Sequence, residues 1–365
     1  SVPMGQTQIY NNLGMLPFMY NTTTTLKCAD RNSNIPSIDA GNIQNHYSNR
    51  LLFETTLFQL DRIQVLKNDT LRVKVTNNCS FTCSFCHHEG SIKSRSLALN
   101  KGLIHGLKRL HTELNLTQAH LTGGEPTSYQ HCRELIGELK SIGYRVKMTS
   151  NGQFDSDLIR QLKDAGLGGI NFSVHTLDAQ KLCTLQRREK NIEWGSHALS
   201  RQLVNVRKAL ESGLEVKINT VVQNNSDIFD VLKIKDYCKN AGISFRILND
   251  LGQGASSIQQ IAMILNLMNA GVEGVNLIDK SSGCSLNMIA KDGFKFKVKY
   301  IRKNTMETLC GDCRRRDACT EWFYGIRVEQ ADDNASVRLC IQRQDYPAIQ
   351  TFGEFFTSRQ FLELL

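Results

Sequence analysis

A repeating alternation of strand-like and helical runs through the middle of the chain constrains its fold more than any other feature. Six short β-rich runs have the length of strands: residues 71–76, 118–122, 144–150, 169–175, 215–222 and 243–248. Amphipathic helical runs lie between them, and several end at a glycine just before the next strand, as at Gly166 and Gly242. Strands joined by helical crossovers pair in parallel, so we expect an α/β fold with a parallel sheet.

The chain changes character on both sides of this alternation. Its first part is rich in Asn and Thr and has no clear period until residue 50, which predicts a loosely packed extension. Beyond the last strand, a helical run is followed by alternating apolar residues within 283–338, a pattern typical of hairpins. We therefore expect three regions: an N-terminal extension over 1–64, a core over 65–255 and a small cysteine-rich appendage over 256–365.

Composition and charge limit the cellular compartment and the kinds of partner that we expect for this chain. The chain has 365 residues, 12 cysteines and a formal net charge of +9. No apolar run approaches the ~20 residues of a membrane span, and residues 1–20 lack the pattern of a secretory signal, so we expect a cytoplasmic protein without a membrane partner. In a reducing compartment, clustered thiols favour metal binding or catalysis over disulfides. The positive charge suits a small anionic substrate, and no nucleic-acid partner is expected.

Three cysteines lie close together on the loop that follows the first core strand. Cys79, Cys83 and Cys86 have the spacing C-x3-C-x2-C. Four protein thiolates would close a metal site, whereas three leave one position open to an external ligand. The spacing alone leaves two interpretations: a [4Fe–4S] cluster with one free iron, or a zinc site completed by His87 or His88.

This loop resembles the cysteine loop of the radical S-adenosylmethionine (SAM) superfamily, and other strand ends match that family too. The run from His120 to Pro126, which contains Gly-Gly-Glu-Pro, is similar to the family's GGEP motif. The likeness extends to the MoaA-type branch, the GTP 3′,8-cyclases, through the aromatic-Cys-x-x-Glu-Gly pattern over 85–90 and the strand at 216–222. Zinc becomes the weaker interpretation at the first site.

The resemblance implies an enzyme with a partial (β/α)6 barrel of the TIM type. A cluster on Cys79, Cys83 and Cys86 would bind SAM and cleave it reductively to a 5′-deoxyadenosyl radical, with the electron supplied by a donor such as flavodoxin or ferredoxin. The residues expected to bind SAM are Phe85, Gly123, Gly124, Glu125, Ser150, Ser173, Asn219 and Leu251. Arg72 and Lys217 fall where the cyclases bind their anionic nucleotide.

Gly123 and Gly124 have two explanations from the sequence. A backbone that approaches a ligand closely has no room for a Cβ atom, and a plain tight turn also favours glycine.

A second group of cysteines lies in the C-terminal region, as Cys310, Cys313, Cys319 and Cys340. The order C-x2-C-x5-C…C is similar to the outer-cluster half of the SPASM domain, which implies an auxiliary [4Fe–4S] cluster enclosed by four thiolates. Other cysteines of that domain are replaced here, so a further auxiliary cluster is doubtful and a ligand role for Cys284 stays open. A zinc ribbon is the alternative that the spacing allows.

Other residues near these motifs have weaker signals. Arg315, in a run of three arginines, is either a clamp for a substrate phosphate or carboxylate or part of a solvated charged face. Four dispersed cysteines lack ligand-like spacing: Cys28, Cys132, Cys183 and Cys238. Cys132 and Cys238 fall in helical patterns, where we expect small buried hydrophobes.

Three enzyme functions follow, and the favoured one is a radical SAM enzyme that acts on a small molecule such as a nucleoside or sugar in a biosynthetic pathway. A GTP 3′,8-cyclase is the second, although the chain does not end in the cyclases' Gly-Gly and His120 replaces a nucleotide-contacting arginine. A peptide maturase is the third, suggested by the SPASM-like cysteines without a recognisable leader-binding segment. A zinc-stabilised binding module is the alternative outside enzymes.

Overall fold

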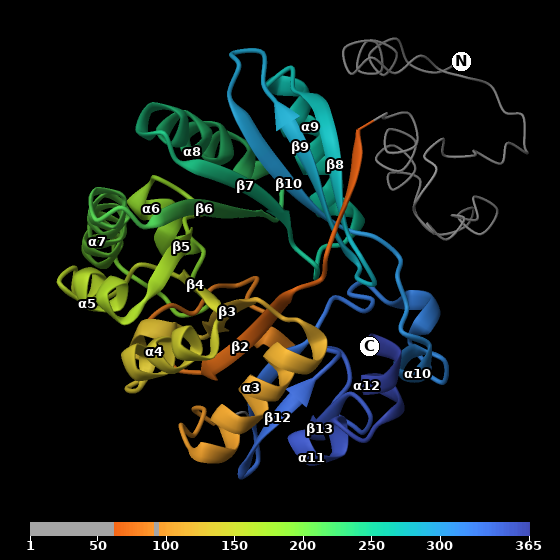
Figure 1. Cartoon of the computed structure of the whole chain (residues 1–365). Helices are drawn as coiled ribbons and strands as arrows, with labels where there is room; N and C mark the ends of the chain where they lie inside the picture. Colours follow the sequence, from red (N-terminus) through yellow and green to blue (C-terminus); the bar gives the residue numbers. More distant parts are fainter. Residues whose placement is uncertain (1–61, 91–94) are drawn as a thin grey trace, which may run out of the picture.

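The computed structural model describes residues 62–90 and 95–365 (Figure 1). The expected extension over 1–64 lies almost wholly outside the described residues.

The core of the protein is the expected parallel sheet. Its strands are β2 (Thr70–Thr76), β3 (Gln118–Gly123), β4 (Arg145–Ser150), β5 (Leu167–Ser173), β6 (Glu215–Val222) and β7 (Ser244–Asn249). Each strand pairs in parallel with the next one along the chain. The predicted α/β class with a partial barrel is therefore confirmed, and the six predicted strands differ from the observed ones only by one or two residues at their ends.

Helices connect the strands and cover the outer face of the sheet (Figure 1). They are α3 (Lys101–Leu114), α4 (Cys132–Ile142), α5 (Leu158–Ala165), α6 (Ala179–Thr184), α7 (Ile192–Glu211), α8 (Ile228–Ala241) and α9 (Ala255–Leu267). Gly166 and Gly242 end α5 and α8 in the left-handed conformation that favours glycine, as predicted. Helix α7 begins directly after Asn191, whose side chain caps it by accepting from the Trp194 N–H.

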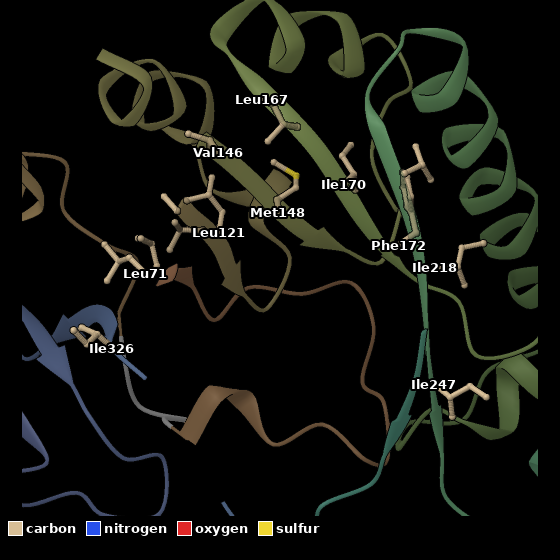
Figure 2. Packing of buried hydrophobic residues seen from close by; sticks show 14 of the residues in the cluster. Leu71, Leu121, Val146, Met148, Leu167, Ile170, Phe172, Ile218, Ile247 and Ile326 are labelled. Carbon is tan, nitrogen blue, oxygen red and sulfur yellow. The ribbon is translucent and has the colours of Figure 1, made fainter. Parts of the chain in front are cut away.

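Side chains alternate along each strand between an apolar layer and the barrel interior. In β4, Val146 and Met148 are buried in the hydrophobic core, while Lys147 and Thr149, which alternate with them, line a cavity. Figure 2 shows this apolar layer, to which Ile170, Phe172, Ile218 and Ile247 of the following strands also belong. Strand period two thus supplies a core on one face and a lined cavity on the other.

The C-terminal region continues the same sheet at both edges. Strands β8 (Gly271–Ile278), β9 (Gly283–Ile289) and β10 (Lys295–Ile301) are antiparallel, and β10 pairs in parallel with β7. At the other edge, β11 (Arg327–Ala331) pairs in parallel with β2, and β12 (Asn334–Arg338) and β13 (Ile349–Thr351) follow. The predicted hairpins are confirmed, and they lie in the sheet of the core.

The short elements at the two ends complete the described chain. Strand β1 (Ile63–Leu66) pairs with β8, and α10 (Glu307–Cys310), α11 (Phe352–Phe355) and α12 (Arg359–Leu364) lie in the C-terminal region. In the part of the chain that the structure describes, none of the helices has the length and apolar character to cross a bilayer.

Candidate functional site

The carboxyl ends of the core strands surround a cavity of about 710 Å³. Every residue predicted for the first site lines this cavity except Glu125: Arg72, Cys79, Cys83, Phe85, Cys86, Gly123, Gly124, Ser150, Ser173, Lys217, Asn219 and Leu251. Residues from six strands and their loops are thus brought together, as the parallel topology requires.

The three cysteines of the first site lie within electrostatic reach of one another. Burial raises the pKa of Cys83 to about 12, and the charges of Cys86 and Cys79 act in the same direction. The Cys86 N–H donates to the Cys83 carbonyl at 3.1 Å, which turns the loop back on itself. The Asn151 side chain donates to the Cys79 Sγ at 3.4 Å. Three thiols therefore face a common space at the edge of the cavity.

A distant segment after α6 holds this loop in place. The Arg187 N–H donates to the Thr82 carbonyl at 2.7 Å, and its guanidinium donates to the Ser84 and Cys86 carbonyls, both at 3.1 Å. The Gln186 side chain accepts from the Thr82 N–H at 2.8 Å. Sequence analysis missed these contacts, because nothing in the local pattern of 185–187 signals a partner about a hundred residues earlier.

Gly123, the last residue of β3, and Gly124 after it are required by the close packing of two loops. A Cβ atom at Gly123 would lie 2.3 Å from the Thr76 carbonyl oxygen, and one at Gly124 would lie 2.3 Å from that of Asn78. The Gly124 N–H donates to the Thr76 carbonyl at 2.7 Å. The backbone of Gly123 and Gly124 therefore approaches the backbone that leads into the cysteine loop, in addition to any ligand.

Glu125 lies beneath the cavity instead of lining it. Its carboxylate accepts from the Ser150 hydroxyl at 2.8 Å, from the Asn151 N–H at 2.7 Å and from the Thr127 hydroxyl at 2.8 Å. Its side chain is 2% exposed. Burial raises the pKa of this carboxyl, while these hydrogen bonds oppose the rise. The carboxylate thus joins the loops after β3 and β4 and positions Ser150 and Asn151.

Helix α7 holds the same strand ends from the outside. The buried amide of Gln202 donates to the carbonyls of Asn151 and Ser173, at 2.7 and 2.9 Å. The Asn205 amide donates to the Gly152 and Phe154 carbonyls. The side chains of Gln202 and Asn205 thus provide hydrogen-bond donors to loop carbonyls that would otherwise be buried without partners.

The wall of the cavity away from the cysteines is cationic. Burial, and after it the charge of Arg246, lowers the pKa of Lys217 to about 8. Arg246 also lines the cavity and donates to the Asn219 side chain at 3.0 Å. The positive charge of Lys299 lowers the pKa of Tyr324 to about 8, and the charge of Arg72 contributes in the same direction. Sequence analysis missed Arg246, Lys299 and Tyr324 as cavity residues.

His175 also lines the cavity, and no motif in the sequence pointed to it. Its Nδ1 accepts from the Val221 N–H at 3.1 Å, and burial lowers the pKa of the ring to about 4. The ring is therefore neutral at physiological pH, with its proton on Nε2. It contacts Phe85 edge-on, with ring centroids 4.7 Å apart.

The four C-terminal cysteines surround a second, much smaller cavity of about 30 Å³. Cys310, Cys313, Cys319 and Cys340 all line it, together with Arg315 and Trp322. Backbone N–H groups of Trp322 and Gln342 donate to the sulfurs of Cys319 and Cys340, at 3.2 and 3.3 Å. Such bonds stabilise a thiolate, as a cluster ligand requires.

The structure also locates the arginine and the other cysteines that the sequence singled out. Arg315 lines the small cavity and does not join Arg72 and Lys217 at the large one. Cys284 is buried in β9 within the hydrophobic core and lines neither cavity. Cys132 and Cys238 are buried in the same core, which confirms the prediction made for them.

Both sets of cysteines fit iron–sulfur clusters. Within residues 62–90 and 95–365, no group of three or more His, Cys, Asp or Glu side chains has the arrangement to hold a single metal ion. In a [4Fe–4S] cube each cysteine binds a different iron, so its thiols must border a shared space instead of meeting at one atom. The three thiols of the first site and the four of the second border such spaces.

The fold is an α/β partial barrel, and the ends of its strands and their loops bring three thiols to one cavity. The family profile described as "Radical SAM superfamily" matches residues 73–238. The chain belongs to the radical SAM superfamily and is a radical SAM enzyme. Enzymes of this superfamily bind a [4Fe–4S] cluster and SAM and require a reductant.

Individual relatives agree with this assignment. GTP 3′,8-cyclase of Aquifex aeolicus is 28% identical over 257 residues, which cover 67% of this chain and 77% of that protein. A probable GTP 3′,8-cyclase of Sulfurisphaera tokodaii is 37% identical over 156 residues, 42% of this chain and 47% of its own length. The chain thus spans about half the length of the second relative.

Among solved structures, SuiB of Streptococcus suis bound to S-adenosylmethionine is similar with a TM-score of 0.50. The identity is 14%, and the match covers 82% of this chain and 64% of that one. At this identity the likeness concerns the fold alone.

Proposed function

We propose that this enzyme cleaves SAM reductively and uses the resulting 5′-deoxyadenosyl radical to abstract hydrogen from a small anionic molecule in a biosynthetic pathway. The observation that carries the proposal is the lining of the large cavity. Three thiols lie at one part of it, and Arg72, Lys217 and Arg246 line another. A cofactor and an anionic substrate thus have separate places within one cavity.

In this proposal Cys79, Cys83 and Cys86 hold the cluster and leave one iron for SAM. When bound, the cluster supplies the electron that breaks the sulfur–C5′ bond of SAM, a step that no side chain performs. The residues proposed to bind SAM line the cavity beside the thiols: Phe85, Gly123, Gly124, Ser150, Ser173, Asn219 and Leu251. Glu125 acts through the loops that it joins, and the cavity walls exclude water from the radical.

Arg72 and Lys217 are proposed to bind the anionic group of the substrate. Both line the cavity, and the charge of Arg246 beside them adds to the positive potential. Cations with few water contacts bind an anion more strongly than solvated ones, because the local dielectric constant is lower. The net charge of +9 supports the same substrate class.

The C-terminal cysteines are proposed to hold an auxiliary [4Fe–4S] cluster. Four thiols close the site, so an electron-transfer or structural role suits it better than substrate binding. Arg315 lines the same small cavity and is proposed to bind a phosphate or carboxylate near this cluster. The electrons are proposed to come from a one-electron donor such as flavodoxin or ferredoxin.

A GTP 3′,8-cyclase activity is the second candidate, and the named relatives favour it. GTP is a polyanion that the cationic wall would accept. Anaerobic incubation with GTP, SAM and a reductant, followed by mass spectrometry of the cyclised nucleotide, tests this activity.

The proposed function is tested by product analysis after anaerobic reconstitution with iron and sulfide. With SAM and dithionite, we expect 5′-deoxyadenosine from the native protein and none from Cys83→Ala. If the native protein forms no more 5′-deoxyadenosine than the variant, the proposal is wrong.

A further inference from the structure

The two cysteine sites meet at the end of the first cysteine loop. Gly90, four residues after Cys86, packs against Ile341, the residue next to Cys340. A Cβ atom at Gly90 would lie 2.4 Å from the Ile341 Cβ and 2.6 Å from its Cα. Gly90 also has a φ of +84°, which favours glycine. The two loops are therefore in direct contact, although about 250 residues separate them along the chain.

A hydrogen bond joins the same two loops. The Gln344 side-chain amide donates to the Gly90 carbonyl at 2.7 Å. Its oxygen accepts from the Arg338 guanidinium at 3.1 Å, so each end of the amide has a partner. Gln344 thus links the first cysteine loop to a residue of β12.

Arg338 connects this link to the second cysteine site. Its guanidinium donates to the Cys340 carbonyl at 3.1 Å and pairs with Glu329 at 2.7 Å. Arg338 and Glu329 are each 1% exposed, so the pair is desolvated and has one well-defined geometry. A rigid series of contacts therefore runs from this buried ion pair to Cys340 and, through Gln344, to Gly90.

The rest of the first loop end is held by the core. The Lys74 ammonium donates to the His88 carbonyl at 2.8 Å, and Arg187 donates to the Cys86 carbonyl at 3.1 Å. Residues 86–90 are thus positioned jointly by the core and by the Cys340 loop. A shift of the Cys340 loop would move the backbone that carries Cys86.

We propose that Ile341 and Gln344 are positioning residues for the SAM-binding cluster, and that filling the C-terminal cysteine site strengthens SAM binding at the first site. This inference rests on the proposed function of both sites. A cluster on Cys340 fixes the Cys340 loop, and that loop fixes the end of the first cysteine loop through Gly90. By linkage, the effect is reciprocal: SAM binding stabilises the occupied C-terminal site.

Two substitutions break the contact without removing a cysteine. Gly90→Ala introduces the Cβ that collides with Ile341. Gln344→Glu keeps an acceptor for Arg338 but cannot donate to the Gly90 carbonyl. Gly293→Ala is the matched control, because Gly293 has a φ of +80° and open space where a Cβ would be. It lies in the turn between β9 and β10, away from both cavities.

The experiment uses the full chain, reconstituted anaerobically, and measures iron content, the SAM dissociation constant and the electron paramagnetic resonance (EPR) spectrum of the reduced protein. We expect Gly90→Ala and Gln344→Glu to retain full iron and to weaken SAM binding at least about fivefold. Their SAM-induced EPR change should shrink, while Gly293→Ala matches the native protein. Cys340→Ala should weaken SAM binding similarly, and adding Gln344→Glu to it should change little more.

The results separate this inference from the proposed function. If the native protein neither binds nor cleaves SAM, the proposed function fails. If the native protein binds and cleaves SAM, two results would show that the coupling is wrong. In the first, Gln344→Glu has the SAM affinity and EPR spectrum of the native protein. In the second, Gln344→Glu weakens SAM binding by its full factor even when it is added to Cys340→Ala. Gln344→Glu decides the question even if Gly90→Ala does not fold.

Discussion

The two cysteine sites differ in the space around their thiols. At the first site, three cysteines border a cavity of about 710 Å³ with a cationic wall. At the second, four cysteines border a cavity of about 30 Å³. Three thiols beside a large cavity leave room for a ligand on the free iron, whereas four around a small one do not. This difference supports the proposed division of roles, with SAM binding and chemistry at the first site and a closed cluster at the second.

The sites also differ in how the chain holds them. The first loop depends on hydrogen bonds from the distant segment around Arg187 and from strand ends joined by Glu125. The second depends on the buried Arg338–Glu329 pair within a single hairpin. An open site thus uses many distant supports, and a closed one uses a compact local support.

The largest expected effect is at the first site. Cys83→Ala should abolish SAM cleavage and lower the iron content from about 8 to about 4 atoms per chain, because one of two cubes is lost. Iron analysis and chromatography of 5′-deoxyadenosine measure both. The buried Cys132→Ala is the control and should keep all the iron. Equal iron in the Cys83→Ala and native proteins would contradict the assignment.

Removing a ligand from the second site should give a different result. Cys313→Ala should also lower the iron to about 4 atoms per chain, yet it should still form 5′-deoxyadenosine at saturating SAM. The reason is that the first cluster keeps its three ligands. The same two measurements apply, and a complete loss of cleavage with 4 iron atoms retained would make the second site part of the chemistry.

A glycine substitution sharpens the comparison further. Gly124→Ala should weaken SAM binding about tenfold or more, because its Cβ would lie 2.3 Å from the Asn78 carbonyl and displace the first cysteine loop. Isothermal titration under anaerobic conditions measures the affinity. Gly137→Ala, in open space on α4, should leave SAM affinity unchanged and raise stability by about 0.5–1 kcal/mol. Similar SAM affinities for the two variants would exclude this role of the loop packing.

The smallest effect concerns pH. Lys217 has a pKa lowered to about 8, so it loses its charge as the pH rises through that value, and the affinity for an anion such as GTP should fall there. Lys217→Arg stays charged and should bind with little change over the same range. The unfolded chain keeps this proton to higher pH, so the lysine's contribution to stability increases from about pH 8 upward. If the affinity of the native protein for GTP does not change with pH over this range, Lys217 is not the anion ligand.

Much of this architecture was predictable from local patterns. Short β-rich runs between helical patterns located β2 to β7, and the spacing of Cys79, Cys83 and Cys86 located the first site. Both signals are local, because β-rich composition and ligand spacing are properties of a few consecutive residues.

The missed features depend on partners far away in the chain. The pairing of β10 with β7 and of β11 with β2 follows from sheet edges that no local pattern reveals. Tyr324 and Lys299 reach the cavity only because of that pairing. Gln344 is similar, since an exposed glutamine in a loop gives no sign of its bond to Gly90.

The central claim is that only the first of two clusters binds SAM, and one measurement tests it most directly. EPR spectra of the reduced Cys313→Ala and Cys83→Ala proteins, each reconstituted anaerobically, are recorded with and without saturating SAM. We predict that SAM changes the spectrum of Cys313→Ala, which keeps the first cluster, and leaves that of Cys83→Ala unchanged. A SAM-dependent change in Cys83→Ala, or none in Cys313→Ala, would contradict the claim.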